Sequence, residues 1–169
     1  YIGIQKIITD SIEPKKFILQ DFTRGNGIVT LNSKNQTDLT KALDFTDADN
    51  IWNNVNLQKD EIATDAHFGA AKTYDYFLQL HNRRSVDNKD LKLISLVHYS
   101  TNFANATWNG TTMNYGDGDN TFKPFTFLDI CGHEISHGFT EFSSNLIYLR
   151  ESGALNESIS DIFGMAIYN

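Results

Sequence analysis

The sequence predicts an α+β fold in which an antiparallel-rich, twisted sheet is covered by helices. Two observations carry this prediction. The first third of the chain alternates short apolar runs with turn signals, and three later segments space their apolar residues three to four apart, as helices do. The length of 169 residues fits one domain with a sizeable core, spanning residues 1–169, rather than two domains.

Strands are expected where apolar runs are bounded by turn residues. The expected strands are Lys16–Thr23, Gly27–Leu31, Leu91–Ser100, Phe103–Trp108 and Thr112–Tyr115. Arg24–Asn26 is a hairpin turn signal between the first two, and Asn109-Gly110 predicts a type I′ hairpin between the last two.

Helices are expected at Asp60–Leu80, Asp129–Phe142 and Glu151–Ile167. The first carries one apolar stripe, made of Ile62, Ala66, Ala70, Tyr74, Phe77 and Leu78. The packing side of the last is expected to be Leu155, Ile159, Ile162, Phe163, Ala166 and Ile167.

Composition excludes several classes of partner. The net charge of −7 argues against nucleic acid or an anionic membrane surface. No apolar run approaches the ~18 residues of a spanning helix. The chain starts at Tyr1, not Met, and shows no signal peptide, so we expect a processed product or a piece trimmed from a longer chain. The single cysteine, Cys131, excludes an internal disulfide and is expected to be a packed core thiol.

The segment His133-Glu134-Ile135-Ser136-His137 carries the chemistry. Residues four apart lie on one face of a helix, so two imidazoles can take two corners of a tetrahedral zinc site. Glu134 lies one residue off that face, close enough to take a proton from a zinc-bound water without being a ligand. Zinc can lower the pKa of such a water toward ~7.

A third ligand follows in the next predicted helix. Glu157 lies twenty positions after His137, and Asp161 stands four residues later on the same face. Two histidines and one glutamate leave a tetrahedral position open, which is typical of catalytic zinc. Asp161 is interpreted as the acceptor for the other N–H of a ligand histidine, or else as an ordinary helix charge or salt bridge.

Other polar groups allow two interpretations. Asp47 and Asp49, two apart on a predicted loop, form either an Asx-type turn or helix cap, or a surface calcium site. His67 and His81 have no second histidine or cysteine at ligand spacing, so we expect structural or surface roles for both.

These motifs resemble the core of the thermolysin-like neutral metalloendopeptidases. The resemblance is carried by His133–Thr140, Leu146–Tyr148 and Glu151–Gly164, and upstream by Gln20–Gly25, Val97–Ser100, Asn105–Gly110 and Tyr115–Asp119. It covers nearly the whole chain and is more specific than the histidine motif alone. It implies the fold of the family's zinc-bearing N-terminal domain.

The resemblance also implies roles for individual residues. Zn²⁺ would be held by His133, His137 and Glu157, with Glu134 as general base and Asp161 as partner of His133. Tyr148 would donate a hydrogen bond to the oxyanion of the reaction. Asn105 and Ala106 would line an edge strand to which the substrate backbone adds, and Phe122, Phe125 and Ile130 would line the pocket for a bulky apolar residue just after the scissile bond.

Calcium and a second domain are further implications of the resemblance. Asp47 and Asp49 match one Ca²⁺ position of the family, and Asp129 lies near another, where a further acidic ligand is replaced by Tyr168. Family members continue into a mainly helical C-terminal domain that closes the cleft, and we expect this domain to be absent from the chain.

We therefore expect a secreted, extracellular zinc endopeptidase that acts on peptide or protein substrates, and little activity from residues 1–169 alone. Two alternatives are a non-catalytic module that binds zinc and peptide, and a calcium-stabilised fragment left by autolysis. Retention of Glu134 and Tyr148 argues against the first alternative, because a pure binder has no use for a general base.

Overall fold

The computed structural model describes residues 3–53, 55–56, 59–119 and 121–169. The strands are β1 (Asp10–Glu13), β2 (Lys16–Ile18), β3 (Gln20–Asp21), β4 (Ile28–Asn32), β5 (Leu43–Asp44), β6 (Thr46–Asp47), β7 (Leu93–Val97), β8 (Ala106–Trp108) and β9 (Met113–Tyr115). The helices are α1 (Asp60–His81), α2 (Leu128–Ser143) and α3 (Arg150–Tyr168), with one 3₁₀ turn, η1 (Leu39–Lys41). The α+β class predicted from the sequence is confirmed.

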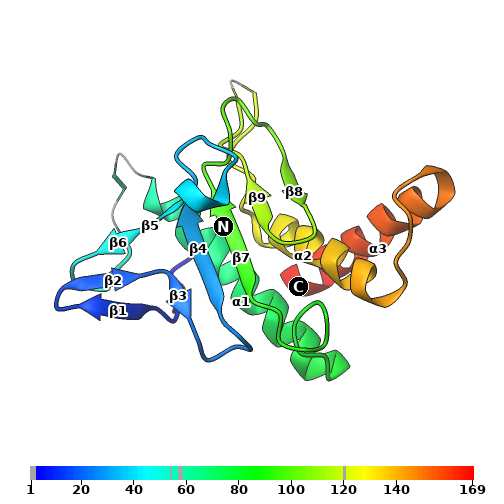
Figure 1. The fold of residues 1–169 in the computed structure, drawn as a ribbon, viewed down its shortest axis with the longest axis horizontal. Coiled ribbons are helices and arrows are strands. Elements are labelled where there is room, and N and C mark those ends of the chain that lie inside the picture. Colours follow the sequence, from blue (N-terminus) through cyan, green and yellow to red (C-terminus); the bar gives the residue numbers. More distant parts are fainter. Residues whose placement is uncertain (1–2, 54, 57–58, 120) are drawn as a thin grey trace.

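Two sheets form the β portion (Figure 1). The smaller has the order β1-β2-β6, and the larger runs β3-β4-β7-β9-β8, with β5 paired to β4. The pairs β4–β7 and β7–β9 are parallel, whereas the others are antiparallel. Parallel neighbours need a long crossover, and α1 lies in the connection between β4 and β7. The sheet is thus antiparallel-rich, as predicted, but its centre is parallel.

Both predicted hairpins are present, and one turn type is wrong. Asp21 pairs with Ile28 across the first. In the second, Trp108 pairs with Met113, so four residues form the loop instead of two. A type I′ turn needs positive φ at both central residues, and of Asn109 and Gly110 only Gly110 has it, at 91°. The Asn109 side chain instead accepts the N–H groups of the residues two and three positions later, at 3.0 and 2.8 Å.

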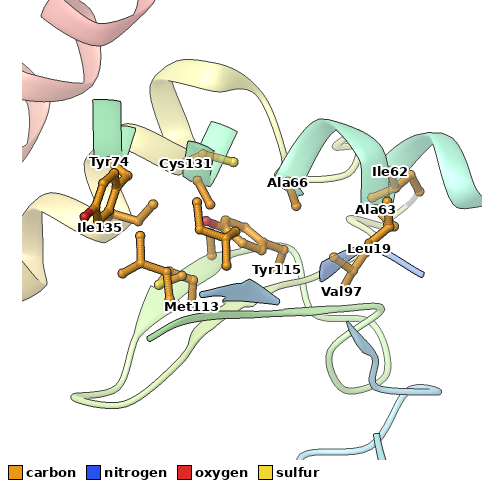
Figure 2. Close-up of a cluster of buried hydrophobic side chains, with 14 of the residues drawn as sticks. Leu19, Ile62, Ala63, Ala66, Tyr74, Val97, Met113, Tyr115, Cys131 and Ile135 are labelled. Atoms are coloured by element: carbon orange, nitrogen blue, oxygen red, sulfur yellow. The ribbon is translucent and has the colours of Figure 1, made fainter. Parts of the chain in front are cut away.

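The core lies between the larger sheet and the helices α1 and α2 (Figure 2). Tyr115 is fully buried in the middle of this cluster, together with Met113, Cys131 and Ile135. Cys131 is therefore the core thiol that we expected, and burial raises its pKa to about 12. The apolar stripe of α1 faces this core as predicted, except that Leu78 is 36% exposed.

The buried face of α3 matches the prediction only in part, because Phe163 packs with its ring centroid 5.0 Å from that of Phe77 and 5.4 Å from that of Phe139, as predicted. The buried residues of α3 are small or polar, namely Gly153, Asn156, Ser160 and Gly164, while Leu155 and Ile162 are 51% and 63% exposed. The physical reason is close packing on α2. A Cβ at Gly164 would lie 2.5 Å from the carbonyl oxygen of Asp129, so the two backbones are nearly in contact.

His67 confirms the structural role expected for it. Its Nε2 donates to the carbonyl oxygen of Ile8 at 2.9 Å, and its Nδ1 accepts from the Thr30 hydroxyl at 3.1 Å. His81 lies among the rings of Tyr76, Phe77 and Phe163. Among the described residues, no helix is long and apolar enough to cross a membrane.

Candidate active site

Three side chains from α2 and α3 converge on one point. The Nε2 atoms of His133 and His137 are 2.9 Å apart, as their spacing of one helical turn predicts. Glu157 on α3 places its carboxylate oxygens 3.3 Å from the first of these nitrogens and 3.5 Å from the second. Among the described residues, His133, His137 and Glu157 form a group of three possible metal ligands. Their ligand atoms all lie within 4.8 Å of one another.

Hydrogen bonds on the far side of each imidazole determine its tautomer. The Nδ1 of His133 contacts Asp161 Oδ1 at 2.8 Å, and the Nδ1 of His137 contacts Asn156 Oδ1 at 2.7 Å. Both oxygens are acceptors, so both Nδ1 atoms carry hydrogen and both neutral Nε2 atoms carry lone pairs. No role for Asn156 was predicted from the sequence. The signal for it is that Asn156 stands next to Glu157 and belongs to the buried α3 face otherwise made of Gly153, Ser160 and Gly164.

This donor set fits a zinc ion. Two nitrogen lone pairs and a carboxylate face one another, and such an arrangement of electron-rich atoms favours a cation. Two histidines and a glutamate are a zinc ligand set, and carboxyl or amide partners on the other ring nitrogens orient such ligands. The residues predicted to hold zinc are thus brought together.

Glu134 lies beside these three side chains and is 7% exposed. Burial raises the pKa of its carboxyl to about 7, although nearby His133 and the backbone N–H of Trp108 act in the opposite direction. A carboxylate with a pKa near neutrality is suited to accept and release a proton.

Tyr148 is 67% exposed, and its hydroxyl donates to Glu157 Oε1. This hydrogen bond is the main cause that raises the pKa of Tyr148 to about 12, so the phenol stays protonated and remains a donor. The structure places Tyr148 at the edge of the histidine pair, with its ring centroid 6.1 Å from that of His137.

β8 is the edge strand of the larger sheet that lies nearer to α3 (Figure 1). A cleft made of two hollows runs along it. At one end is a hollow of about 250 Å³ lined by Asn105, Ala106, Phe125 and Ile130, together with Asp129, His133, Glu134, Asp161, Gly164 and Met165. Phe122 is not among these lining residues. It is 57% exposed, and its ring centroid lies 6.1 Å from that of Phe125.

The other end of the cleft is a larger hollow of about 700 Å³. It is lined by residues 105–110, by the α2 residues His133, Glu134, His137 and Glu141, and by 145–148, Asn156 and Glu157. His133 and Glu134 line both hollows, so the histidine–glutamate cluster stands between them. An extended chain lying along β8 would therefore pass this cluster.

The predicted calcium residues lie in two places. Asp47 Oδ1 accepts the N–H of Asp49 at 3.0 Å, and Asp49 Oδ1 accepts the N–H of Ile51 at 2.9 Å. These are two successive Asx turns, the alternative considered for this pair. Asp129 instead lines the smaller hollow, and its Oδ1 accepts the N–H of Ile130 at 3.0 Å.

Comparison with known families assigns nearly the whole length of the chain. The sequence model described as the thermolysin metallopeptidase catalytic domain matches residues 1–141, and the one described as the thermolysin metallopeptidase alpha-helical domain matches residues 144–169. The boundary falls at the end of α2. His133 and His137 thus lie in the segment matched by the first model, and Glu157 lies in the segment matched by the second.

Curated relatives agree with this assignment. A bacillolysin from Brevibacillus brevis is 46% identical over 170 residues, which is 99% of this chain and 31% of that protein. A bacillolysin from Bacillus cereus is 46% identical over 98% of this chain and 29% of its own length, and a thermolysin from Alicyclobacillus acidocaldarius is 44% identical over 98% and 30%. The chain spans about a third of the length of these relatives.

One solved structure has the same fold. It is described as the precursor of protealysin, a metalloproteinase from Serratia proteamaculans. The two superpose with a TM-score of 0.72 and 36% sequence identity, over 85% of this chain and 44% of that one.

Proposed function

The chain belongs to the thermolysin metallopeptidase family, and from this membership we propose that it holds one zinc ion and provides catalytic residues of an endopeptidase. The proposed ligands are His133, His137 and Glu157. The observation that carries the proposal is the convergence of two Nε2 lone pairs and one carboxylate, with both Nδ1 atoms already engaged by acceptors. We propose hydrolysis of internal peptide bonds as the reaction.

Each side chain has a separate task in this proposal. Bound zinc would supply Lewis acidity, polarising the scissile carbonyl and lowering the pKa of a water toward ~7. Glu134 accepts the proton of the attacking water and passes it to the departing amine. Asp161 orients His133. The hydroxyl of Tyr148 donates a hydrogen bond to the developing oxyanion, and to do so it must first give up its hydrogen bond to Glu157.

The cleft supports a peptide substrate. β8 pairs with β9 on one side only, so its other edge can accept an extended chain through backbone hydrogen bonds, near Asn105 and Ala106. The smaller hollow, with Phe125 and Ile130 in its wall, would take an apolar side chain just after the scissile bond. Phe122 would stand at its rim through its ring contact with Phe125.

We also propose two properties of the family for this chain, Ca²⁺ at Asp47 and Asp49 or near Asp129, and secretion. Calcium is supported by the carboxylate chemistry of these residues. Titration of thermal stability with Ca²⁺, in the chain and in an Asp49→Asn variant, tests the first of these sites. Detection of the protein in the culture medium of its source tests secretion.

The experiment for the main proposal measures metal and cleavage separately. Elemental analysis of dialysed protein should give one zinc per chain, and a Glu157→Ala variant should lose most of it. Zinc-loaded protein should cleave a peptide library only slowly, before bulky apolar residues, and Glu134→Gln should abolish this slow cleavage while retaining zinc.

The outcomes separate the candidate functions. Less than half an equivalent of zinc, or full retention of zinc in Glu157→Ala, would refute the ligand assignment. Zinc-dependent peptide binding without any cleavage that depends on Glu134 would instead support a non-catalytic module.

A further inference from the structure

The larger hollow contains one carboxylate that the proposed reaction does not use. Glu141 lies on α2, four residues after His137 and eight after His133, so all three share one helix face. Four residues of helix rise about 6 Å, which places the start of the Glu141 side chain one turn beyond the second histidine. The carboxylate is on the wall of the cleft and is exposed.

Glu141 is held in place but not neutralised. The indole N–H of Trp108, on the edge strand β8, donates to its Oε2 at 2.7 Å. Its other oxygen, Oε1, lies beside Gly110, where an added Cβ would be in ordinary van der Waals contact with it at 3.7 Å. Within the described residues, Glu141 has no ion pair with a lysine or arginine.

The surrounding wall carries no compensating cation. Among the described residues lining the larger hollow there is no lysine or arginine. The carboxylates of Glu134 and Glu157 are engaged by the proposed proton transfer and metal binding. Among the described lining residues, Glu141 is therefore the carboxylate of this hollow that remains available to interact with a bound chain along β8.

We propose that Glu141 selects substrates with a lysine or arginine on the N-terminal side of the scissile bond. This inference rests on the proposed function, in which the smaller hollow takes the residue just after that bond, so the larger hollow takes the residues before it. Trp108, which holds the Glu141 carboxylate, lies two residues along β8 from Ala106, and Ala106 lines both hollows. On an extended chain beside β8, Glu141 therefore faces the second residue before the bond.

Peptide analogues that do not depend on turnover test the inference. Phosphinic peptides, in which a phosphinate replaces the scissile bond, would carry Lys, Gln or Glu at the second position before it and leucine after it. Calorimetry on zinc-loaded protein should show the Lys peptide binding about fivefold more tightly than the Gln peptide, which is the upper range for an exposed charge pair. The Glu peptide should bind more weakly than the Gln peptide. The preference should shrink in 1 M salt, where the Debye length is about 3 Å.

Two variants show whether the preference is local. Glu141→Gln keeps an acceptor for the Trp108 indole but removes the charge, and it should reduce the Lys-over-Gln ratio to about one. Glu151→Gln is the matched control, because it removes the same charge from the exposed first turn of α3, outside both hollows. It should leave the ratio at the wild-type value.

The results distinguish the inference from its premise. A Lys preference that survives Glu141→Gln, or that Glu151→Gln removes equally, overturns the role of Glu141 while zinc-dependent binding upholds the proposed function. Equal binding of the Lys and Glu peptides by wild-type protein would also overturn the role of Glu141 without affecting the proposed function. If none of the peptides binds, or if binding does not need zinc, the proposed function and the inference both fail.

Discussion

Replacing Gly164 with alanine should separate α2 from α3 and loosen the zinc site. A Cβ built at Gly164 would lie 2.5 Å from the carbonyl oxygen of Asp129 and 3.3 Å from the backbone nitrogen of His133. Both contacts are with the backbone of α2, which cannot rotate away as a side chain can. The helices must therefore move apart by several tenths of an ångström or more to reach ordinary contact distance.

The magnitude follows from two opposing effects. Overpacking of this kind typically costs about 1–3 kcal/mol. Alanine is the better helix former and returns about 1 kcal/mol of that. Gly164→Ala should therefore lower the free energy of unfolding by up to about 2 kcal/mol. Because Glu157 and Asp161 move with α3, the disturbed support of the histidines should weaken zinc binding by about 10–100-fold.

Urea unfolding of the metal-free protein and competition with a zinc chelator measure the two effects. Ser158→Ala is the control, because Ser158 is an exposed α3 residue where alanine changes helix propensity without the clash. An unfolding free energy for Gly164→Ala at or above that of wild type, with unchanged zinc affinity, would refute the close-packing argument.

Three further predictions test other parts of the structure. Asn156→Ala should weaken zinc binding about 10–100-fold in the same chelator assay, because the Nδ1 hydrogen of His137 loses its best acceptor; unchanged affinity would contradict this. Burial lowers the pKa of His67 below its ordinary 6.5, so its contribution to stability should be complete above about pH 6.5 and decline as the pH falls below it. The stability difference between wild type and His67→Gln should thus be larger at pH 8 than at pH 5 in urea unfolding, and a constant difference would count against this. Cys131 is fully buried with its pKa raised to about 12, so iodoacetamide at pH 8 should leave it unmodified until the protein unfolds, as mass spectrometry can show.

Local pattern was enough to locate the three helices, the two hairpins and the candidate chemistry, but it missed the short strands β1, β5 and β6. The period of apolar residues predicted α1, α2 and α3 to within a few residues, and turn residues predicted both hairpins. The spacing of His133 and His137 predicted that they share a face, because the helical repeat sets that geometry without any other part of the chain. Local pattern gave the wrong turn type at Asn109. The side chain of Asn109 forms an Asx turn, and the Asn-Gly dipeptide does not distinguish an Asx turn from a type I′ turn.

Tertiary structure decided what lies between the elements. The parallel centre of the sheet, the small-residue face of α3 and the partner of His137 all depend on contacts between segments distant in sequence. Apolar periodicity assigned Leu155 and Ile162 to the packing face of α3, yet both are exposed, since the α2 backbone approaches Gly164 too closely for large side chains. By itself the sequence determined which groups can bind a metal and which helices carry them. Only the packing of α3 on α2 decided that Glu157 meets the two histidines, because a helical repeat orders residues along one helix and contains no information on how closely two helices cross.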